Sequence, residues 1–324
     1  MKLLKKILKW GGIGIVTLVA LLAVYVQVNW QKKFDAPYPE LKASSDPEVI
    51  KRGEYLVYGP AHCGECHINN DEYPRAIKGE KLALAGGFEF KLPLGSAYSK
   101  NISTHKEHGI GKYSDAEIAR VLRYGVKPDG TALIDFMPFY NASDADIIAI
   151  ISYLRTLPAN DRVVPPNKWN FLGKALMAFV IKPVGPTGTP PKSVRIDSTA
   201  EYGKYLANSI ANCRGCHTNR DLTTGAFIGP DYAGGLKMES ATGEANVFCV
   251  TPNITTDETG VLKNFDEQTF INRFRKGKLI PESIMPWGPF SNFSDADLKA
   301  IYAYLQTVNP VKNETGPVVL RETK

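Results

Sequence analysis

Two five-residue stretches, Cys63-Gly64-Glu65-Cys66-His67 and Cys213-Arg214-Gly215-Cys216-His217, contain residues whose types and spacing indicate chemistry. Each reads C-x-x-C-H, the attachment signature of a c-type haem. Two thiols at this spacing can each form a thioether bond to one porphyrin, and the following histidine can ligate the iron. A disulfide, a redox-active thiol pair and half of a zinc site are the alternatives. A zinc site needs two further ligands nearby and a redox pair needs no histidine, so we predict two covalently bound haems c.

A haem iron held by one histidine has a sixth position, which a methionine sulfur can fill. Of the chain's five methionines, the first half offers Met137, while the second offers Met238 or Met285. Met137 and Met285 both precede proline, which disfavours helix at the residue before it. We therefore predict these pairs in stiff loops as iron ligands, with His67 paired to Met137 and His217 to Met285. No residue is assigned a catalytic role.

The remaining histidines and the fifth cysteine have weaker signals. His62, His105 and His108 have no counterpart in the second half, so we interpret them as surface residues. Cys249 is expected to be buried and inert.

The N-terminus reads as a membrane segment. Four lysines within the first nine residues precede 22 uncharged residues, Trp10 to Gln31. This run is long enough to span a bilayer, and its flanking lysines and tryptophans fit a membrane helix with the rest of the chain outside. A cleaved signal peptide is the alternative. We predict a single-pass anchor in a bacterial inner membrane, with the haem-bearing part in the periplasm. The lysines supply four of the six units of formal net charge, so nothing suggests nucleic-acid binding.

The two haem motifs lie in a longer internal repeat. Its paired segments keep an offset of 148–152 residues: Gly53-x-Tyr-Leu and Gly203-x-Tyr-Leu, Asn101-Ile-Ser and Asn253-Ile-Thr, Gly125 and Gly277, the two Met-Pro pairs, and the Ser-Asp-Ala-Asp segments that begin at Ser143 and Ser294. A tandem duplication leaves this pattern.

The order of elements expected from the sequence is helical. We predict helices over 47–57 and 199–208 before the haem motifs, after the capping box at Ser114, and after the serine caps at Ser143 and Ser294. Long glycine-rich loops at Gly86 and Gly234 separate them. The fold class expected is all-α, with these divisions: anchor 1–32, tether 33–45, first haem domain 46–158, linker 159–196 with a short helix over 169–181 covering the seam between the domains, second haem domain 197–313, and tail 314–324. A membrane-lying linker segment is the alternative, weakened by the absence of a cationic face.

This sequence of motifs resembles class I cytochromes c and, more narrowly, the cytochrome c subunits of periplasmic alcohol, aldehyde and gluconate dehydrogenases. The resemblance covers about residues 46–313. It implies two tandem class I domains, with Asn101 and Asn253 approaching haem propionates. Two features depart from the family: it usually carries three haems, and Thr259-Gly-Val-Leu replaces a Thr-Gly-Ile-Gly pattern.

The function implied is electron transfer and not an enzymatic reaction of the chain itself. The donor expected is a dehydrogenase or a quinol-oxidising complex, and the acceptor a soluble cytochrome, a copper protein or a terminal oxidase of a respiratory chain. A dihaem peroxidase is the alternative, which requires one iron with an open sixth position. The paired Met137 and Met285 argue against it.

Overall fold

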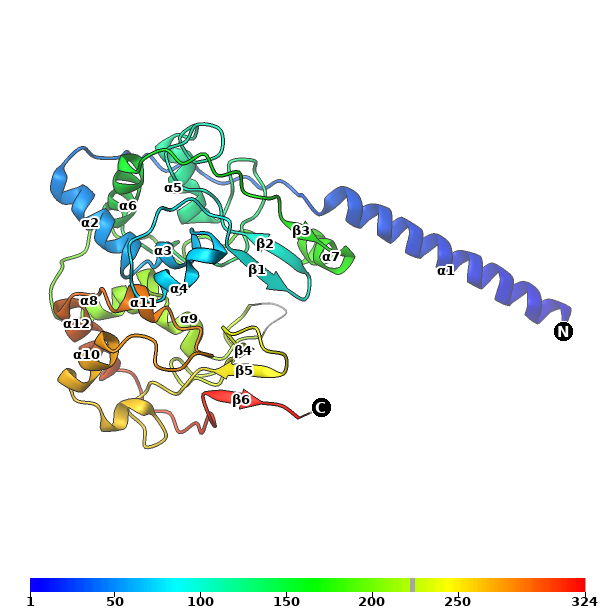
Figure 1. Ribbon diagram of the computed structural model, residues 1–324. Coiled ribbons are helices and arrows are strands. Elements are labelled where there is room, and N and C mark those ends of the chain that lie inside the picture. The colour runs from blue at the N-terminus through cyan, green and yellow to red at the C-terminus, as the bar shows by residue number, and fades with distance from the viewer. Residues whose placement is uncertain (222–224, 324) are drawn as a thin grey trace.

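The structure is a computed structural model that describes residues 1–221 and 225–323. The first part of the chain contains α1 (Lys2–Asn29), α2 (Pro47–Tyr58), α3 (Cys63–Cys66), a 3-10 turn (Asn70–Glu72), α4 (Tyr73–Ala76), β1 (Glu89–Leu92), β2 (Gly95–Tyr98), α5 (Asp115–Tyr124) and α6 (Asp144–Thr156). After β3 (Lys168–Trp169) and α7 (Phe171–Phe179) come α8 (Ala200–Tyr205), a π-helical turn (Leu206–Ile210), α9 (Cys213–His217), β4 (Lys237–Glu239), β5 (Val247–Val250), a 3-10 turn (Val261–Asn264), α10 (Glu267–Arg275), α11 (Trp287–Phe290), α12 (Asp295–Leu305) and β6 (Val319–Arg321). Figure 1 shows two halves side by side, with α1 projecting away from them.

The expected helices are present because their local start signals are satisfied. Asp46 caps α2, with Pro47 at the first helical position. Ser114 and Glu117 form a reciprocal capping box on α5. Ser143 and Ser294 accept hydrogen bonds from the backbone N–H three residues later, which starts α6 and α12. The helix expected over 199–208 is instead α8 continued by the π-helical turn.

Each half is built on a crossing of its first and last helices, α2 with α6 and α8 with α12. A Cβ on Gly53 would lie 1.9 Å from the carbonyl oxygen of Ala149, and one on Gly203 would lie 1.8 Å from that of Ala300. The glycines are therefore needed because the backbones of the crossing helices touch.

Gly203→Ala and Gly53→Ala are each expected to lower the free energy of unfolding by about 1–3 kcal/mol, because the added methyl group forces the crossing helices apart. Gly188→Ala is the matched control, since no atom lies within 4 Å of its Cβ position. It should change stability by no more than about 0.5 kcal/mol. Denaturant unfolding of the purified chain in detergent measures the difference. Equal midpoints for Gly203→Ala and Gly188→Ala would contradict it.

The all-α expectation is wrong, because two small antiparallel sheets accompany the helices. One sheet has the order β1-β2-β3 and the other β4-β5-β6. The third strand of each comes from a segment in which no strand was expected: β3 from the linker, where Trp169 was expected to start a helix, and β6 from the C-terminal tail. Strands of two to four residues have no hydrophobic periodicity long enough to be recognised in the sequence.

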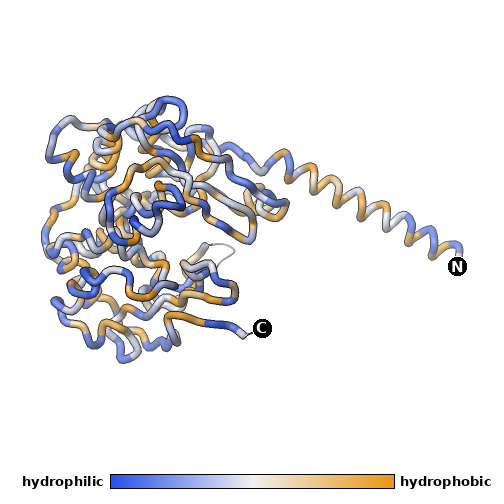
Figure 2. Tube along the Cα trace, viewed as in Figure 1, coloured by the Kyte–Doolittle hydropathy of each residue, from blue (hydrophilic) through white to orange (hydrophobic). Residues whose placement is uncertain are grey.

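Among the described residues, α1 is the one helix long and apolar enough to cross a membrane. Figure 2 shows its apolar length behind a hydrophilic N-terminus. A signal sequence has the same character. The linker helix α7 packs against α1 and follows β3. It lies at the base of α1 and away from α8 and α12 (Figure 1), so its expected position over the seam is wrong.

A reciprocal pair of tyrosines joins the two halves. The hydroxyl of Tyr55 donates to the Asp297 carboxylate at 2.6 Å and accepts from the backbone N–H of Ser294 at 2.9 Å. In the mirrored arrangement, Tyr205 donates to Asp146 at 2.7 Å and accepts from the N–H of Ser143 at 2.9 Å. Each tyrosine of a Gly-x-Tyr-Leu segment therefore caps the last helix of the other half.

The double variant Tyr55→Phe/Tyr205→Phe is expected to uncouple the halves, so that their unfolding separates into two transitions. Burial raises the pKa of Asp297, and a buried carboxylate that loses its partner costs about 1–3 kcal/mol. Tyr302→Phe is the control, because the hydroxyl of Tyr302 donates to the carbonyl of Phe265 within one half. It should lower stability without splitting the transition. Calorimetry of the purified chain distinguishes these outcomes, and a single unshifted transition in the double variant would refute the coupling.

Candidate haem sites

The two C-x-x-C-H motifs have the same local conformation. α3 and α9 carry their cysteines, and each is preceded by a residue with positive φ, His62 at 41° and Asn212 at 53°. In both halves a backbone hydrogen bond between residues five positions apart precedes the motif. The N–H of Ala61 donates to the carbonyl of Leu56, and the N–H of Ala211 donates to the carbonyl of Leu206, each at 2.8 Å. The motifs therefore leave α2 and the π-helical turn in the same way.

Each motif histidine is oriented by a backbone carbonyl. The Nδ1 atom of His67 lies 2.7 Å from the carbonyl oxygen of Lys100, and that of His217 lies 2.9 Å from the carbonyl oxygen of Pro252. A carbonyl only accepts, so Nδ1 carries the proton and Nε2 keeps its lone pair. Burial also lowers the pKa of both imidazoles. Both histidines are thus neutral and held ready to ligate a metal through Nε2.

The two Asn-Ile segments hold these carbonyls in place. Asn101 follows Lys100, and its side-chain amide donates to the carbonyls of Asn160 at 2.8 Å and Arg162 at 3.2 Å. Asn253 follows Pro252 and donates to the carbonyl of Val311 at 2.8 Å. Both asparagines are buried. They tie the carbonyl-bearing loop to the segment after the last helix, and their approach to haem propionates stays a prediction.

All five cysteines are free thiols. Burial raises the pKa of Cys63, Cys66 and Cys213 to about 12, and it also raises the pKa of Cys216. Within each motif the two thiols are near enough for one to influence the pKa of the other. The motifs therefore present paired, neutral sulfurs in apolar surroundings. Among residues 1–221 and 225–323, no group of three or more His, Cys, Asp and Glu could hold a metal ion.

The two Met-Pro pairs share a tight backbone hydrogen bond, although only the second pair leads into a helix, α11. The carbonyl of Met137 accepts from the N–H of Phe139 at 2.9 Å, and that of Met285 accepts from the N–H of Trp287 at 2.7 Å. Both methionines are half-buried outside regular helix and border the main core cluster, as Cys63 and Cys213 do. The alternative Met238 lies in β4, where it pairs with Cys249 of β5. Met177 lies in α7.

Two buried arginine nitrogen atoms without a hydrogen-bond partner indicate which chemical group the candidate haem sites could bind. Among the described residues, the Nε atoms of Arg162 and Arg220 are two of three such atoms. Arg162 lies beside Gly87, where a Cβ would be 3.6 Å from its side chain, and the charge of Arg220 acts on the Cys216 thiol. A guanidinium with an Nε atom left without a partner therefore lies in each half, and guanidinium groups suit a carboxylate, the group that haem carries as propionate. The donor set and these cations therefore fit a haem in each half.

The third unpartnered atom is Oε2 of Glu65, between the cysteines of the first motif. Burial raises the pKa of Glu65 to about 8, opposed by the charge of Lys278 from the second half. Lys278 is also influenced by Cys249, which in turn affects Cys216. α11 of the second half contacts α3 as well. Both motifs therefore lie near the junction of the two halves.

The remaining predicted surface residues differ in position. His62 is half-buried, with its ring 5.5 Å from that of Phe290 in the second half, so its interpretation as a surface residue is wrong. His108 is exposed, and His105 stacks on it at 4.9 Å. The Nδ1 atom of His105 accepts a hydrogen bond from the backbone N–H of Glu107 at 3.2 Å, so the imidazole stabilises the local loop. Cys249 is buried as expected.

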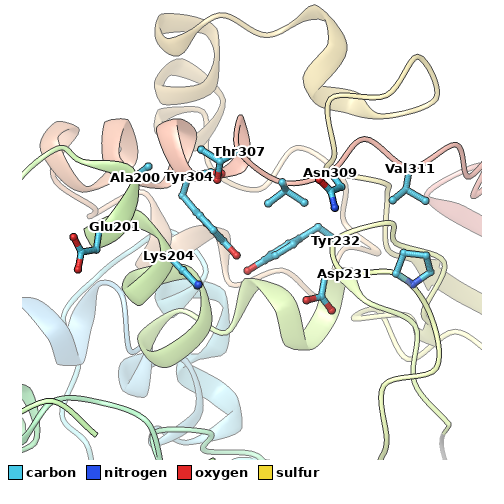
Figure 3. A pocket seen from close by; sticks show the side chains of 11 residues that line it. Ala200, Glu201, Lys204, Asp231, Tyr232, Tyr304, Thr307, Asn309 and Val311 are labelled. Atoms are coloured by element: carbon cyan, nitrogen blue, oxygen red, sulfur yellow. The ribbon is translucent and has the colours of Figure 1, made fainter. Parts of the chain in front are cut away.

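A surface pocket of about 700 Å³ lies elsewhere, between α8, α12 and the loop at 230–232. Figure 3 shows Tyr232 and Tyr304 pointing toward one another across it, with Glu201, Lys204 and Asp231 at its edge. None of the eight predicted haem-binding residues lines it. The pocket therefore does not contain the predicted ligands, but it adjoins the second motif, because Asp231 at its edge pairs with Arg214 at 2.9 Å.

Sequence reasoning missed the groups that surround the predicted ligands. These are the carbonyls of Lys100 and Pro252 and the guanidinium groups of Arg162 and Arg220. The sequence did carry a signal for the two carbonyls, because Lys100 and Pro252 each immediately precede the repeated Asn-Ile segment. The two arginines occupy unrelated places in the repeat, so nothing in the pattern indicates them.

Comparison with known proteins agrees with this geometry. Residues 198–305 match the family described as cytochrome C oxidase, cbb3-type, subunit III. The fructose dehydrogenase cytochrome subunit of Gluconobacter japonicus is 28% identical over 302 residues, 87% of this chain and 57% of that protein. The alcohol dehydrogenase (quinone) cytochrome c subunit of Gluconacetobacter polyoxogenes is 28% identical over 84% of this chain and 58% of its own length. The chain thus spans a little over half the length of these relatives.

A third relative is similar in length to this chain. The diheme cytochrome c-type protein of Cereibacter sphaeroides is 28% identical over 282 residues, which cover 83% of this chain and 91% of that protein. These relatives are named as cytochromes or as cytochrome subunits of dehydrogenases, which supports haem c and electron transfer here. The predicted resemblance to the c-type cytochromes, and to the cytochrome c subunits of dehydrogenases in particular, is therefore confirmed.

Proposed function

We propose that this chain is a membrane-anchored dihaem cytochrome that relays electrons on the periplasmic face of a bacterial inner membrane. The observation that carries the proposal is the duplicated contact between a backbone carbonyl and Nδ1 of each motif histidine, 2.7 Å at His67 and 2.9 Å at His217. A histidine with a purely structural role would not require the same contact at the equivalent position of both halves. It keeps Nε2 of both histidines available for iron.

The residues that would hold the first haem are Cys63, Cys66, His67 and Met137; those for the second are Cys213, Cys216, His217 and Met285. The cysteines attach the porphyrin, the histidine and methionine ligate the iron, and Arg162 and Arg220 offer cations to the propionates. A bound haem supplies reversible one-electron transfer at its iron. The chain's part is to fix the ligands, exclude water and set the reduction potential through the axial pair.

The proposed direction of transfer is from a dehydrogenase or quinol-oxidising complex to a soluble cytochrome, a copper protein or a terminal oxidase. Two observations support a relay within the chain. The reciprocal tyrosines fix one half against the other, and α3 of the first motif contacts α11 of the second half. Relatives named as dehydrogenase subunits support a dehydrogenase as donor.

The intact mass of the purified protein tests the cofactor and the anchor together. We expect a mass increase for two haems on a chain that retains residues 1 to 30. One haem would contradict the dihaem proposal, and loss of the apolar N-terminus would contradict the anchor. A redox titration should then resolve two low-spin haems. A high-spin haem with peroxide turnover would instead support the peroxidase alternative.

A further inference from the structure

The helix α7 has an apolar face that the rest of the described chain covers only in part, at Phe179. Phe171, Leu172 and Phe179 are 57%, 64% and 51% exposed, although they belong to a helix of nine residues. They lie at i, i+1 and i+8, which places them along one side of the helix. Three large exposed apolar side chains on one short helix indicate a surface that another apolar phase covers.

The position of α7 identifies that phase. The ring of Phe179 stacks on Tyr25 of α1 at 5.2 Å. Lys174 donates to the side chain of Gln27 at 3.0 Å, and its ammonium group lies 5.2 Å from the ring centre of Trp30. These three partners occupy the C-terminal end of α1, so α7 is fixed to the end at which the apolar helix joins the rest of the chain (Figure 1).

The length of α1 sets the depth of this contact. A helix of 28 residues is about 42 Å long, whereas the hydrocarbon core of a bilayer is about 30 Å thick. The end of α1 that carries Tyr25 and Trp30 therefore falls at the level of the headgroups, where tyrosine and tryptophan are enriched. Through the stacking of Phe179 on Tyr25, the apolar residues of α7 meet those of α1.

Cations occur in the segments next to this surface. Lys32 lies three residues after the end of α1, and Lys168 and Lys182 flank α7 at its two ends; all are exposed. Such lysines suit the anionic headgroups of a bilayer surface. The sequence alone shows no cationic face on α7, because these charges come from the segments on either side of it and from the end of α1.

We infer that α7 is an interfacial helix that inserts Phe171, Leu172 and Phe179 into the outer leaflet of the membrane spanned by α1. The inference rests on the proposed anchor. With α1 it gives the chain two points of attachment, which fix the orientation of both halves above the bilayer. Apolar burial of this kind adds to membrane binding in proportion to the area inserted.

Spin labels on the full chain in phosphatidylethanolamine–phosphatidylglycerol vesicles test the inference. Labels are placed on Leu172→Cys, on Leu18→Cys within α1, and on Val163→Cys, which is 69% exposed in the linker. Cys249→Ala removes the remaining thiol. Power saturation compares collisions with oxygen, which concentrates in lipid, and with a water-soluble nickel complex. We expect positions 18 and 172 to be accessible to oxygen and shielded from nickel, and position 163 to collide with nickel.

The outcomes separate the inference from the anchor. If position 18 is in lipid and position 172 behaves like position 163, α7 does not insert and the inference is wrong while the anchor holds. If position 18 collides with nickel as well, the anchor itself fails. Shielding of position 172 from both reagents indicates contact with a protein, such as a second copy of the chain, and also overturns the inference.

Discussion

A chain in which Cys213 and Cys216 are both replaced by alanine is expected to carry one haem instead of two. The haem absorbance per chain should fall by half, because the thioether bonds to these sulfurs are what make attachment covalent. The mirrored variant Cys63→Ala/Cys66→Ala should lose the other haem to the same extent. Haem content per chain, measured on denatured protein with a mass spectrum of the same sample, checks both.

The control for this experiment is Cys249→Ala, which removes the one cysteine outside the motifs and should leave both haems in place. Cys249 is buried in β5 close to Cys216, so it also tests whether the loss is specific to the motif thiols. Retention of two haems by Cys213→Ala/Cys216→Ala would refute the assignment of the second motif. If the one-haem variants still passed electrons to the native acceptor at the original rate, the relay would be wrong.

Met137→Leu and Met285→Leu are each expected to convert one haem from a low-spin, six-coordinate state to a high-spin state. The thioether sulfur favours ferrous iron, so its loss should lower the potential of that haem by at least on the order of 0.1 V, within the ~0.8 V range over which axial ligands set haem potentials. The weak charge-transfer band of ferric iron bound to methionine, near the red end of the spectrum, should lose the share of the altered haem. The potential of the other haem should change little.

Met238→Leu and Met177→Leu are the matched controls. Met238→Leu is the more demanding control, because Met238 pairs with Cys249, which lies close enough to Cys216 of the second motif to affect its pKa. If Met238→Leu removed the band that Met285→Leu left intact, Met238 would be the ligand and the symmetry of the two Met-Pro loops would be misleading. If neither substitution altered the spectrum, the sixth ligand would not be methionine.

Much of the fold could be predicted because its signals are local. The helix starts at Asp46, Ser114, Ser143 and Ser294 depend on side chains within three residues of the backbone N–H groups that they cap. The haem motifs, the Met-Pro pairs and the internal repeat are likewise contiguous patterns. The structure gives each motif and its copy matching backbone hydrogen bonds, and the residues assigned as ligands remain predictions that the Cys and Met variants test.

The sheets and the linker could not be predicted from local signals. β3 and β6 contain two and three residues, and they become strands only because β2 and β5 offer a free edge. The helix α7 was recognisable as a helix, but its partner α1 lies more than 140 residues earlier in the chain. The helix was expected to cover the seam, but it contacts α1 because tertiary packing brings these distant parts of the chain together.

The sequence by itself determined where the long helices begin and that the chain contains an internal repeat, and it predicted which residues bind haem. Only the tertiary structure decided that the carbonyls of Lys100 and Pro252 orient the two histidines, and that Tyr55 and Tyr205 cap the opposite half. The reason is physical. Capping and attachment depend on residue type within a few positions, whereas a carbonyl is present at every residue and becomes specific only when folding places one beside an imidazole.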